Sequence, residues 1–181
     1  SQLESKWNDR LNLSAGGRFE YFQLNDSITA SKPIFRAGTT YRIHKATFLR
    51  ASYGQGFRFP TITERFIKTG VGNFGVFPNP NLKPEINNQI ELSFLKKFET
   101  IEIGASVFHS FLVDYISAIV NTSIPRKFMP TTPPVYAKQF INLDKASQTG
   151  VEFSFNVKSS DNLTFTSDVC YTKAENKDFD E

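Results

Sequence analysis

The feature that most constrains this chain is a two-residue period of apolar and polar side chains. From residue 11 to residue 21 every odd position is apolar or small, and every even position is polar or glycine. A two-residue period places successive side chains on opposite faces of a β-strand, whereas a helix would mix the two kinds on every face. The segment therefore predicts a strand with one apolar and one polar face.

The same alternation recurs along the whole chain and predicts an all-β protein. An aromatic content of 14%, with 19 phenylalanines, also favours strands. We expect an antiparallel meander of about seven amphipathic strands. The alternating segments are 11–21, 34–43, 46–53, 89–94, 101–111, about 135–157, and 162–171.

The expected connections alternate in length. Short ones fall near residues 44–45, 97–99 and 158–161, and longer ones at 25–33, 54–87 and 117–134. Alternate turns of a meander lie at the same end of the sheet, so short turns and long loops would be sorted to opposite ends. That sorting is typical of transmembrane barrels of the outer-membrane type. A soluble β-sandwich that binds carbohydrate or protein is the alternative, because any half-buried antiparallel sheet alternates.

Composition excludes several classes of function. The single Cys170 excludes an internal disulfide framework and a multi-cysteine zinc site. A net charge of +3 is too small to indicate nucleic-acid binding, and no serine-hydrolase, phosphate-loop or zinc-protease motif occurs. We therefore expect no enzyme activity, no metal site and no cofactor. The chain begins without methionine or a signal peptide, so we interpret it as a processed product or a fragment.

Two motifs near the middle of the chain resemble those of a known family. Residues 57–60 read Phe-Arg-Phe-Pro with Glu64 shortly after, and residues 79–85 read Asn-Pro-Asn-Leu-Lys-Pro-Glu. Both are similar to signatures of TonB-dependent outer-membrane receptors. Further similarities follow in the same order on the alternating segments: Gly17 to Glu20, Phe108 with Val113 to Ile116, and Asn142, Ala146 and Gly150 to Glu152.

This resemblance implies a fold and a function for the parent protein. Such receptors are large barrels with a plugged lumen, and residues 1–181 would be a partial barrel domain that lacks the plug and the closing strands. The resemblance implies energised uptake of a scarce, bulky ligand, most often a ferric siderophore, in the bacterial outer membrane. Its partners would be outer-membrane lipid, that ligand, and the TonB complex through the missing N-terminal part. Haem, cobalamin and glycans are alternative ligands, and haem is less favoured because residues 61–78 contain no histidine.

The expected external loop at 54–87 is the candidate ligand site. Arginines orient anionic groups and aromatic rings supply contact area, although the prolines that flank the loop also suit a purely architectural corner. The glycine pattern at 70, 72 and 75 predicts no nucleotide site, because the prolines at 78 and 80 prevent a following helix. The candidate contacts are Phe57, Arg58, Glu64, Arg65, Phe66, Phe74 and Phe77.

A second set of charged residues falls on the polar face of the expected strands and would line the barrel lumen. Ion pairing along the wall, or contact with the plug, is the simplest role for them. His109 falls on the apolar face and Cys170 on the polar face, and neither is expected to bind metal. The lumen candidates are Arg18, Glu20, Arg36, Arg42, Arg50, Glu91, Glu102, Glu152 and Asp168.

Overall fold

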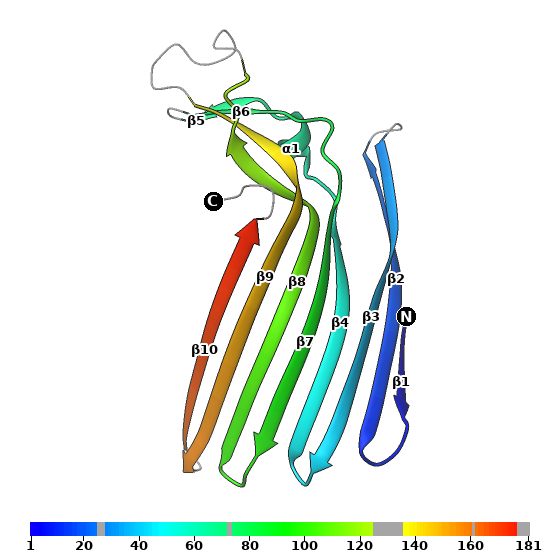
Figure 1. Ribbon diagram of the computed structural model, residues 1–181, viewed down its shortest axis with the longest axis vertical. Helices are drawn as coiled ribbons and strands as arrows, with labels where there is room; N and C mark the ends of the chain where they lie inside the picture. The colour runs from blue at the N-terminus through cyan, green and yellow to red at the C-terminus, as the bar shows by residue number, and fades with distance from the viewer. Residues whose placement is uncertain (25–27, 72–73, 125–135, 161, 177–181) are drawn as a thin grey trace. The chain divides into compact units, whose positions relative to one another are not determined.

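The computed structural model describes residues 1–24, 28–71, 74–124, 136–160 and 162–176 (Figure 1). These residues form ten strands and one short helix, in two compact units. The first unit contains Ser1–Gly56, Asn87–Phe111 and Ser147–Glu175, and the second contains Phe57–Ile86, Leu112–Ala146 and Asn176–Glu181. The elements are β1 Gln2–Lys6, β2 Leu11–Leu24, β3 Ile28–His44, β4 Thr47–Arg58, α1 Ile62–Phe66, β5 Thr69–Val71, β6 Phe74–Phe77, β7 Glu85–Lys97, β8 Ile101–Val120, β9 Tyr136–Ser160 and β10 Leu163–Asn176.

The strands of the first unit follow one another across the sheet in chain order, from β1 to β4 and then from β7 to β10. The seven expected strands are all present, as β2, β3, β4, β7, β8, β9 and β10. The turns between β3 and β4 and between β7 and β8 lie at one end of this unit, at the bottom of Figure 1. The meander with short turns at one end is thus confirmed.

One expected loop is wrong. The sequence suggested a long connection at 25–33, but β3 begins at Ile28 and pairs with β2 as far as the contact between Leu24 and Ile28. Only residues 25–27, which lie outside the described residues, remain between the two strands. The expected connection at 117–134 also shortens, because β8 continues to Val120; residues 125–134 lie outside the described residues.

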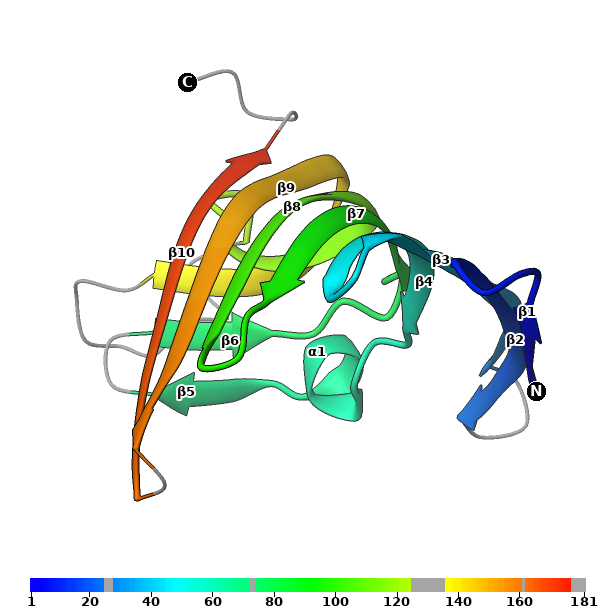
Figure 2. The ribbon, with the colours of Figure 1, turned by 90° about the horizontal axis from the view of Figure 1, so that it is seen from below.

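The register keeps like faces together across neighbouring strands of the first unit. Tyr41 lies opposite Leu49 and Ala37 opposite Tyr53, so the apolar positions coincide across β3 and β4. Large apolar side chains on the apolar face are exposed: Phe19, Phe153 and Phe165 are 58–69% exposed. Figures 1 and 2 show β7, β8 and β9 side by side. The first unit is therefore a single layer with an uncovered apolar face, as a strand wall in lipid would need.

Most of the buried apolar side chains belong to the second unit. Its fully buried Pro60 is joined by five apolar side chains that are at most 8% exposed: Phe77, Leu82, Ile116, Ala137 and Leu143. The connection between β4 and β7 thus shares a core with residues of β8 and β9. We call residues 59–84 the β4–β7 loop.

Local signals explain the elements inside the β4–β7 loop. Thr61 and Glu64 form a reciprocal capping box that starts α1, and the helix ends at Phe66, with Ile67 as its C-cap. β5 and β6 form a hairpin, and β6 then pairs in parallel with β9, from Phe74 with Tyr136 to Phe77 with Gln139. Gly75 lies in β6, so a strand follows the glycine pattern.

No helix among the described residues is long and apolar enough to span a membrane.

Candidate functional site in the loop between β4 and β7

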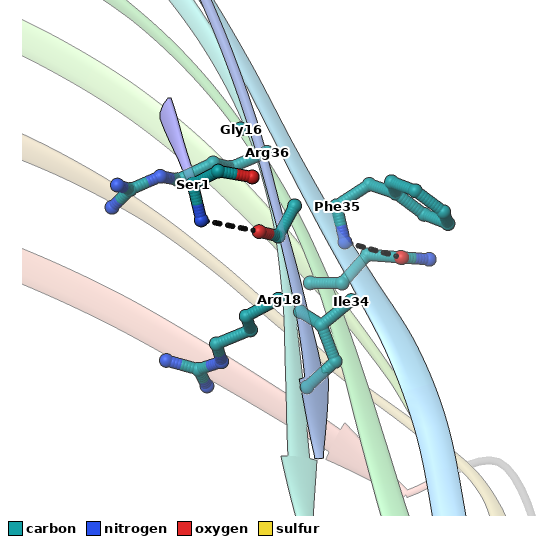
Figure 3. A pocket seen from close by; sticks show the side chains of 8 residues that line it. Ser1, Gly16, Arg18, Ile34, Phe35 and Arg36 are labelled. Carbon is teal, nitrogen blue, oxygen red and sulfur yellow. Dashed lines mark hydrogen bonds between the residues drawn. The ribbon is translucent and has the colours of Figure 1, made fainter. Parts of the chain in front are cut away.

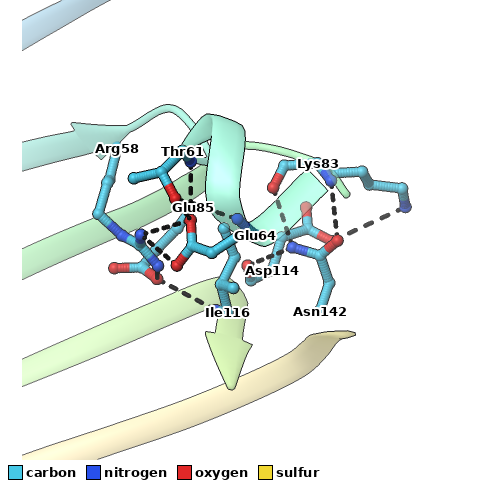
Figure 4. A network of polar contacts seen from close by, with 8 residues as sticks. All are labelled: Arg58, Thr61, Glu64, Lys83, Glu85, Asp114, Ile116 and Asn142. Atoms are coloured by element: carbon cyan, nitrogen blue, oxygen red, sulfur yellow. Dashed lines mark hydrogen bonds and ion pairs between the residues drawn. The ribbon is translucent and has the colours of Figure 1, made fainter. Parts of the chain in front are cut away.

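An ion triad closes the base of the β4–β7 loop. Arg58, the last residue of β4, places Nη1 at 3.0 and 3.2 Å from the two carboxylate oxygens of Glu64 in α1. Its Nη2 donates to Oε2 of Glu85, the first residue of β7, at 3.0 Å. Both carboxylates are largely shielded from solvent, with 13% and 14% of their side chains exposed. The two ends of the loop are therefore joined through one guanidinium group (Figure 4).

The capping box places Glu64 for this contact. The backbone N–H of Thr61 donates to Oε2 of Glu64 at 2.7 Å, and the N–H of Glu64 donates to Oγ1 of Thr61 at 3.2 Å. Burial by itself would raise the pKa of Glu64, but the hydrogen bonds from Thr61 and Arg58 outweigh it and lower the pKa below its usual value. The carboxylate is therefore held in its charged form.

The Glu85 end of the network contacts β8 next to an irregular point in that strand. Asp114 has a φ of 53°, in the left-handed region that non-glycine residues rarely adopt. Two residues beyond it, the backbone N–H of Ile116 donates to Oε2 of Glu85 at 3.1 Å. A side chain from β7 thus accepts a backbone hydrogen bond from β8, and the same carboxylate binds Arg58.

Asn142 in β9 joins the network from the opposite side. Its Nδ2 donates to the carbonyl of Asp114 at 2.7 Å and to the carbonyl of Lys83 at 2.9 Å, while its Oδ1 accepts from the N–H of Lys83 at 2.8 Å. Lys83 Nζ also lies 3.7 Å from Oδ1 of Asp114. Figure 4 shows these groups converging from the loop, β8 and β9. Residues from motifs that lie far apart in the sequence therefore meet in one place.

A second set of contacts holds the far part of the loop to β9. Asn79 Nδ2 donates to the carbonyl of Phe140 at 2.9 Å, and Gln139 Nε2 donates to the carbonyl of Pro78 at 2.9 Å. Asn121, just after β8, donates to Oε1 of Gln139 at 2.7 Å. Together with the parallel pairing of β6, these bonds attach the loop along β9.

Arg65 lies inside the loop and is only 8% exposed. Its guanidinium carbon is 5.6 Å from the ring centre of Phe59 and 5.5 Å from that of Phe66, within the range of cation–π attraction. Nη2 donates to the carbonyl of Pro80, whereas Nε is buried with no hydrogen-bond partner among the described residues. Arg65 thus contacts two aromatic rings and the backbone of Pro80 at the same time.

The structure brings some of the predicted ligand residues together and separates others. Arg58 and Glu64 bind each other, Arg65 and Phe66 are in contact, Phe77 is buried and Phe57 half-buried. The side chain of Phe74 lies outside the described residues. Direct contact of these seven residues with a ligand remains a prediction. Ile62 and Ile67 were not predicted from the sequence as site residues, and they are 58% and 40% exposed beside Phe66.

The predicted lumen charges lie in the first unit, several of them around one open pocket of about 420 Å³. Its lining includes Arg50, Glu91, Glu152 and Asp168, together with Cys170, whose Sγ is 3.8 Å from Oε1 of Glu152. These five residues therefore share a face of the sheet. Lining a lumen remains a prediction for them.

The remaining lumen candidates make local contacts. Arg18 pairs with Glu20 at 2.7 Å, Glu102 with Lys97 at 2.6 Å, Arg36 binds Gln2, and Arg42 donates to the Asp9 carbonyl. Figure 3 shows a pocket of about 170 Å³ where Arg18 and Arg36 extend from one side of the sheet and Phe35 from the other. The polar and apolar faces are thus separated at the level of individual side chains.

His109 and the described carboxylates form no metal site. Nδ1 of His109 is 2.6 Å from Oγ1 of Thr149, and its ring meets the ring of Phe111 edge-on at 4.2 Å. Within the described residues, no group of three histidine, cysteine or acidic side chains is placed to hold a metal ion.

Comparison with known proteins gives one family for the entire chain. Residues 1–181 match the family described as TonB dependent receptor-like, beta-barrel. Among curated proteins, the "Hemin receptor" of Yersinia pestis is 31% identical over 74% of this chain and 20% of its own length. The "Iron-regulated outer membrane virulence protein" of Vibrio cholerae is 24% identical over 97% of this chain and 27% of its own length. The chain thus spans about a fifth to a quarter of these relatives.

Solved structures share the fold. The siderophore receptor PirA from Pseudomonas aeruginosa superposes with a TM-score of 0.76 at 16% identity, over 97% of this chain and 33% of that one. "Copper transporter OprC" gives a TM-score of 0.74 at 18% identity, over 97% of this chain and 28% of that one. The exposed apolar face, the sorted turns and the match over all residues agree, and the chain belongs to the β-barrel family of TonB-dependent outer-membrane receptors.

Proposed function

We propose that this chain forms part of the barrel of a receptor that takes up an iron-bearing chelate across the bacterial outer membrane. A ferric siderophore is the first candidate ligand, and the TonB complex would supply the energy through parts of the receptor outside this chain. The family match over residues 1–181 supports this proposal, and so do the relatives named "Hemin receptor" and "Iron-regulated outer membrane virulence protein".

The observation that carries the proposal is the anchoring of the β4–β7 loop. Arg58, Glu85 and Asn142 join the loop to β7, β8 and β9 through ion pairs and hydrogen bonds of 2.7–3.0 Å. Binding residues tend to sit on loops held by a rigid scaffold, and a prefolded loop loses less entropy when it binds a ligand. A folded, anchored loop of this length suits a ligand-contacting role.

Haem is a second candidate because the Yersinia relative, at 31% identity, is named a hemin receptor. Neutral imidazole is a common iron ligand, and residues 61–78 hold no histidine. The loop of this chain therefore offers no imidazole to the iron of haem. A ferric chelate whose iron is already fully coordinated needs no ligand from the protein, and this favours the siderophore.

The test is uptake of labelled iron by iron-starved cells that carry or lack the receptor. Three iron sources would be supplied separately: a ferric catecholate, a ferric hydroxamate and hemin. We expect uptake of one of them to require both the receptor and TonB. Deletion of residues 68–76, which removes β5 and most of β6, should reduce that uptake at least tenfold at normal surface expression. Equal uptake of all three sources with and without the receptor would contradict the proposed function.

A further inference from the structure

Three apolar side chains are exposed on and next to α1, in a loop rich in charge. Ile62 is 58% exposed, Phe66 41% and Ile67 40%. Ile62 and Phe66 are four residues apart on the helix and therefore lie on the same side of it, with Ile67 immediately after. We call these three residues the α1 platform.

Three charged residues at or near α1 make internal contacts, whereas Lys68 and Lys83 of the same loop are exposed. Arg58 and Glu64 neutralise each other, and Arg65 is buried behind Phe66. The exposed surface at α1 therefore consists of these three apolar side chains together with Thr63, and the exposed cation Lys68 follows in the sequence. Adjacent exposed apolar side chains on a folded loop are a feature of binding surfaces.

The Phe66 ring is backed by a positive charge. The guanidinium carbon of Arg65 lies 5.5 Å from the ring centre, and Arg65 has no carboxylate partner among the described residues. From residue 57 to residue 86 the sequence holds four cationic and two acidic side chains, so the loop carries an excess of positive charge. A flat, electron-rich and anionic group is complementary both to the exposed ring and to the charge behind it.

We propose that the α1 platform stacks against the aromatic face of an anionic iron chelate and selects for ligands that have such a face. The inference rests on the proposed function and narrows its substrate class. Catecholate chelates and porphyrins both supply a flat, anionic aromatic group, whereas hydroxamate chelates have aliphatic arms. The receptor should therefore bind a catecholate or hemin in preference to a hydroxamate.

The test measures binding of a ferric catecholate, hemin and a ferric hydroxamate to the intact receptor in detergent. One of the two aromatic probes should bind, and Phe66→Ala should raise its Kd about tenfold. Phe66→Tyr keeps the ring, so the Kd of this variant should stay within about twofold of the wild-type value. Thr63→Ser, an exposed change on the same helix, is the matched control. Preferential binding of the hydroxamate, or an aromatic probe whose Kd is unchanged by Phe66→Ala, would overturn the inference.

A labelling experiment separates a ligand surface from a surface covered by another part of the receptor. In Ile62→Cys receptor that also carries Cys170→Ser, a membrane-impermeant maleimide on whole cells should react in the absence of ligand, and the aromatic probe should slow the reaction at least fivefold. A thiol that is unreactive without ligand would assign the platform to a contact inside the receptor and overturn the inference. A receptor that binds none of the three probes would contradict both the stacking role and the proposed function. Binding of an aromatic probe that does not slow the maleimide reaction would contradict only the stacking role.

Discussion

The ring of Phe108 in β8 lies directly over the α-carbon of Gly150 in β9. A Cβ at position 150 would overlap Cζ and Cε1 of that ring and come within 3.0 Å of the carbonyl oxygen of Tyr171. Glycine is therefore required at this point for close packing between the two strands, since backbone and ring both block a side chain.

Gly150→Ala should destabilise the folded barrel by about 1–3 kcal/mol, because the ring or the strand must move to admit the methyl group. Folding of the receptor into detergent or lipid at graded urea concentrations would measure the loss. Gly54→Ala is the control, because nothing lies within 4 Å of the Cβ it would add. Equal midpoints for the two variants would show that β9 relaxes freely around position 150.

Arg58→Ala should loosen the base of the β4–β7 loop. It leaves Glu64 and Glu85 without their shared cation, and removing one partner from a shielded pair costs about 1–3 kcal/mol. Hydrogen exchange should rise in residues 59–84 and remain unchanged in β2 and β3. Arg18→Ala removes an ion pair whose arginine side chain is 62% exposed, and should cost at most about 1 kcal/mol. If both variants exchange alike, the triad does not hold the loop.

Phe153 and Ser154 are neighbours with opposite environments in β9. Phe153 is 58% exposed on the apolar face, and Ser154 is half-buried on the opposite side of the strand. Phe153→Arg would place a charge in lipid at about 2–4 kcal/mol near the bilayer midplane, whereas Ser154→Arg should be much milder. Folded yield in liposomes compares the two directly. Similar yields would mean that these faces do not meet lipid and lumen as the register requires.

Protonation of Glu64 at low pH should destabilise the folded β4–β7 loop. The pKa of this carboxyl is lowered in the folded loop, so its contribution to stability is fully present above the ordinary value of 4.5 and is lost as pH falls through the lowered pKa. Protease cleavage within residues 59–84 should therefore accelerate below about pH 4. Glu64→Gln should be cleaved faster at neutral pH and show a flatter pH profile. A wild-type rate that is constant from pH 7 to pH 3 would exclude this linkage.

The alternating pattern predicted the strands, and the side of the sheet on which each side chain lies, because both are local properties. Each of the seven segments carries its own two-residue period, and the period alone decides which side chains face the same way. The capping box at Thr61 and Glu64 was also a local signal, and it could have predicted the start of α1. By contrast, β6 depends on parallel pairing with β9, more than 60 residues away, and no local pattern reports that.

The wrong loop at 25–33 has a physical reason. Pro33 reads as a strand breaker, but β3 pairs with β4 only from Arg36 to His44, so Pro33 lies beyond that ladder and needs no N–H on that side. In the site, Arg58 was predicted as a ligand contact because charged loop residues can bind anionic ligands, and its pairing with Glu85, 27 residues away, has no local signal. Which charges neutralise each other is a tertiary property, and the sequence alone could not decide it.

Asn142 imitates a peptide group. Its side-chain amide presents one carbonyl and one N–H edge to the backbone of Lys83, so Lys83 is paired through both its N–H and its carbonyl as a strand residue would be. Aspartate at this position could accept but not donate, and glutamine, one methylene longer, would displace the amide from Lys83 and from the carbonyl of Asp114. The loop is therefore joined to β9 by a side-chain amide that takes the place of a backbone peptide group, and asparagine is the side chain that fits this role.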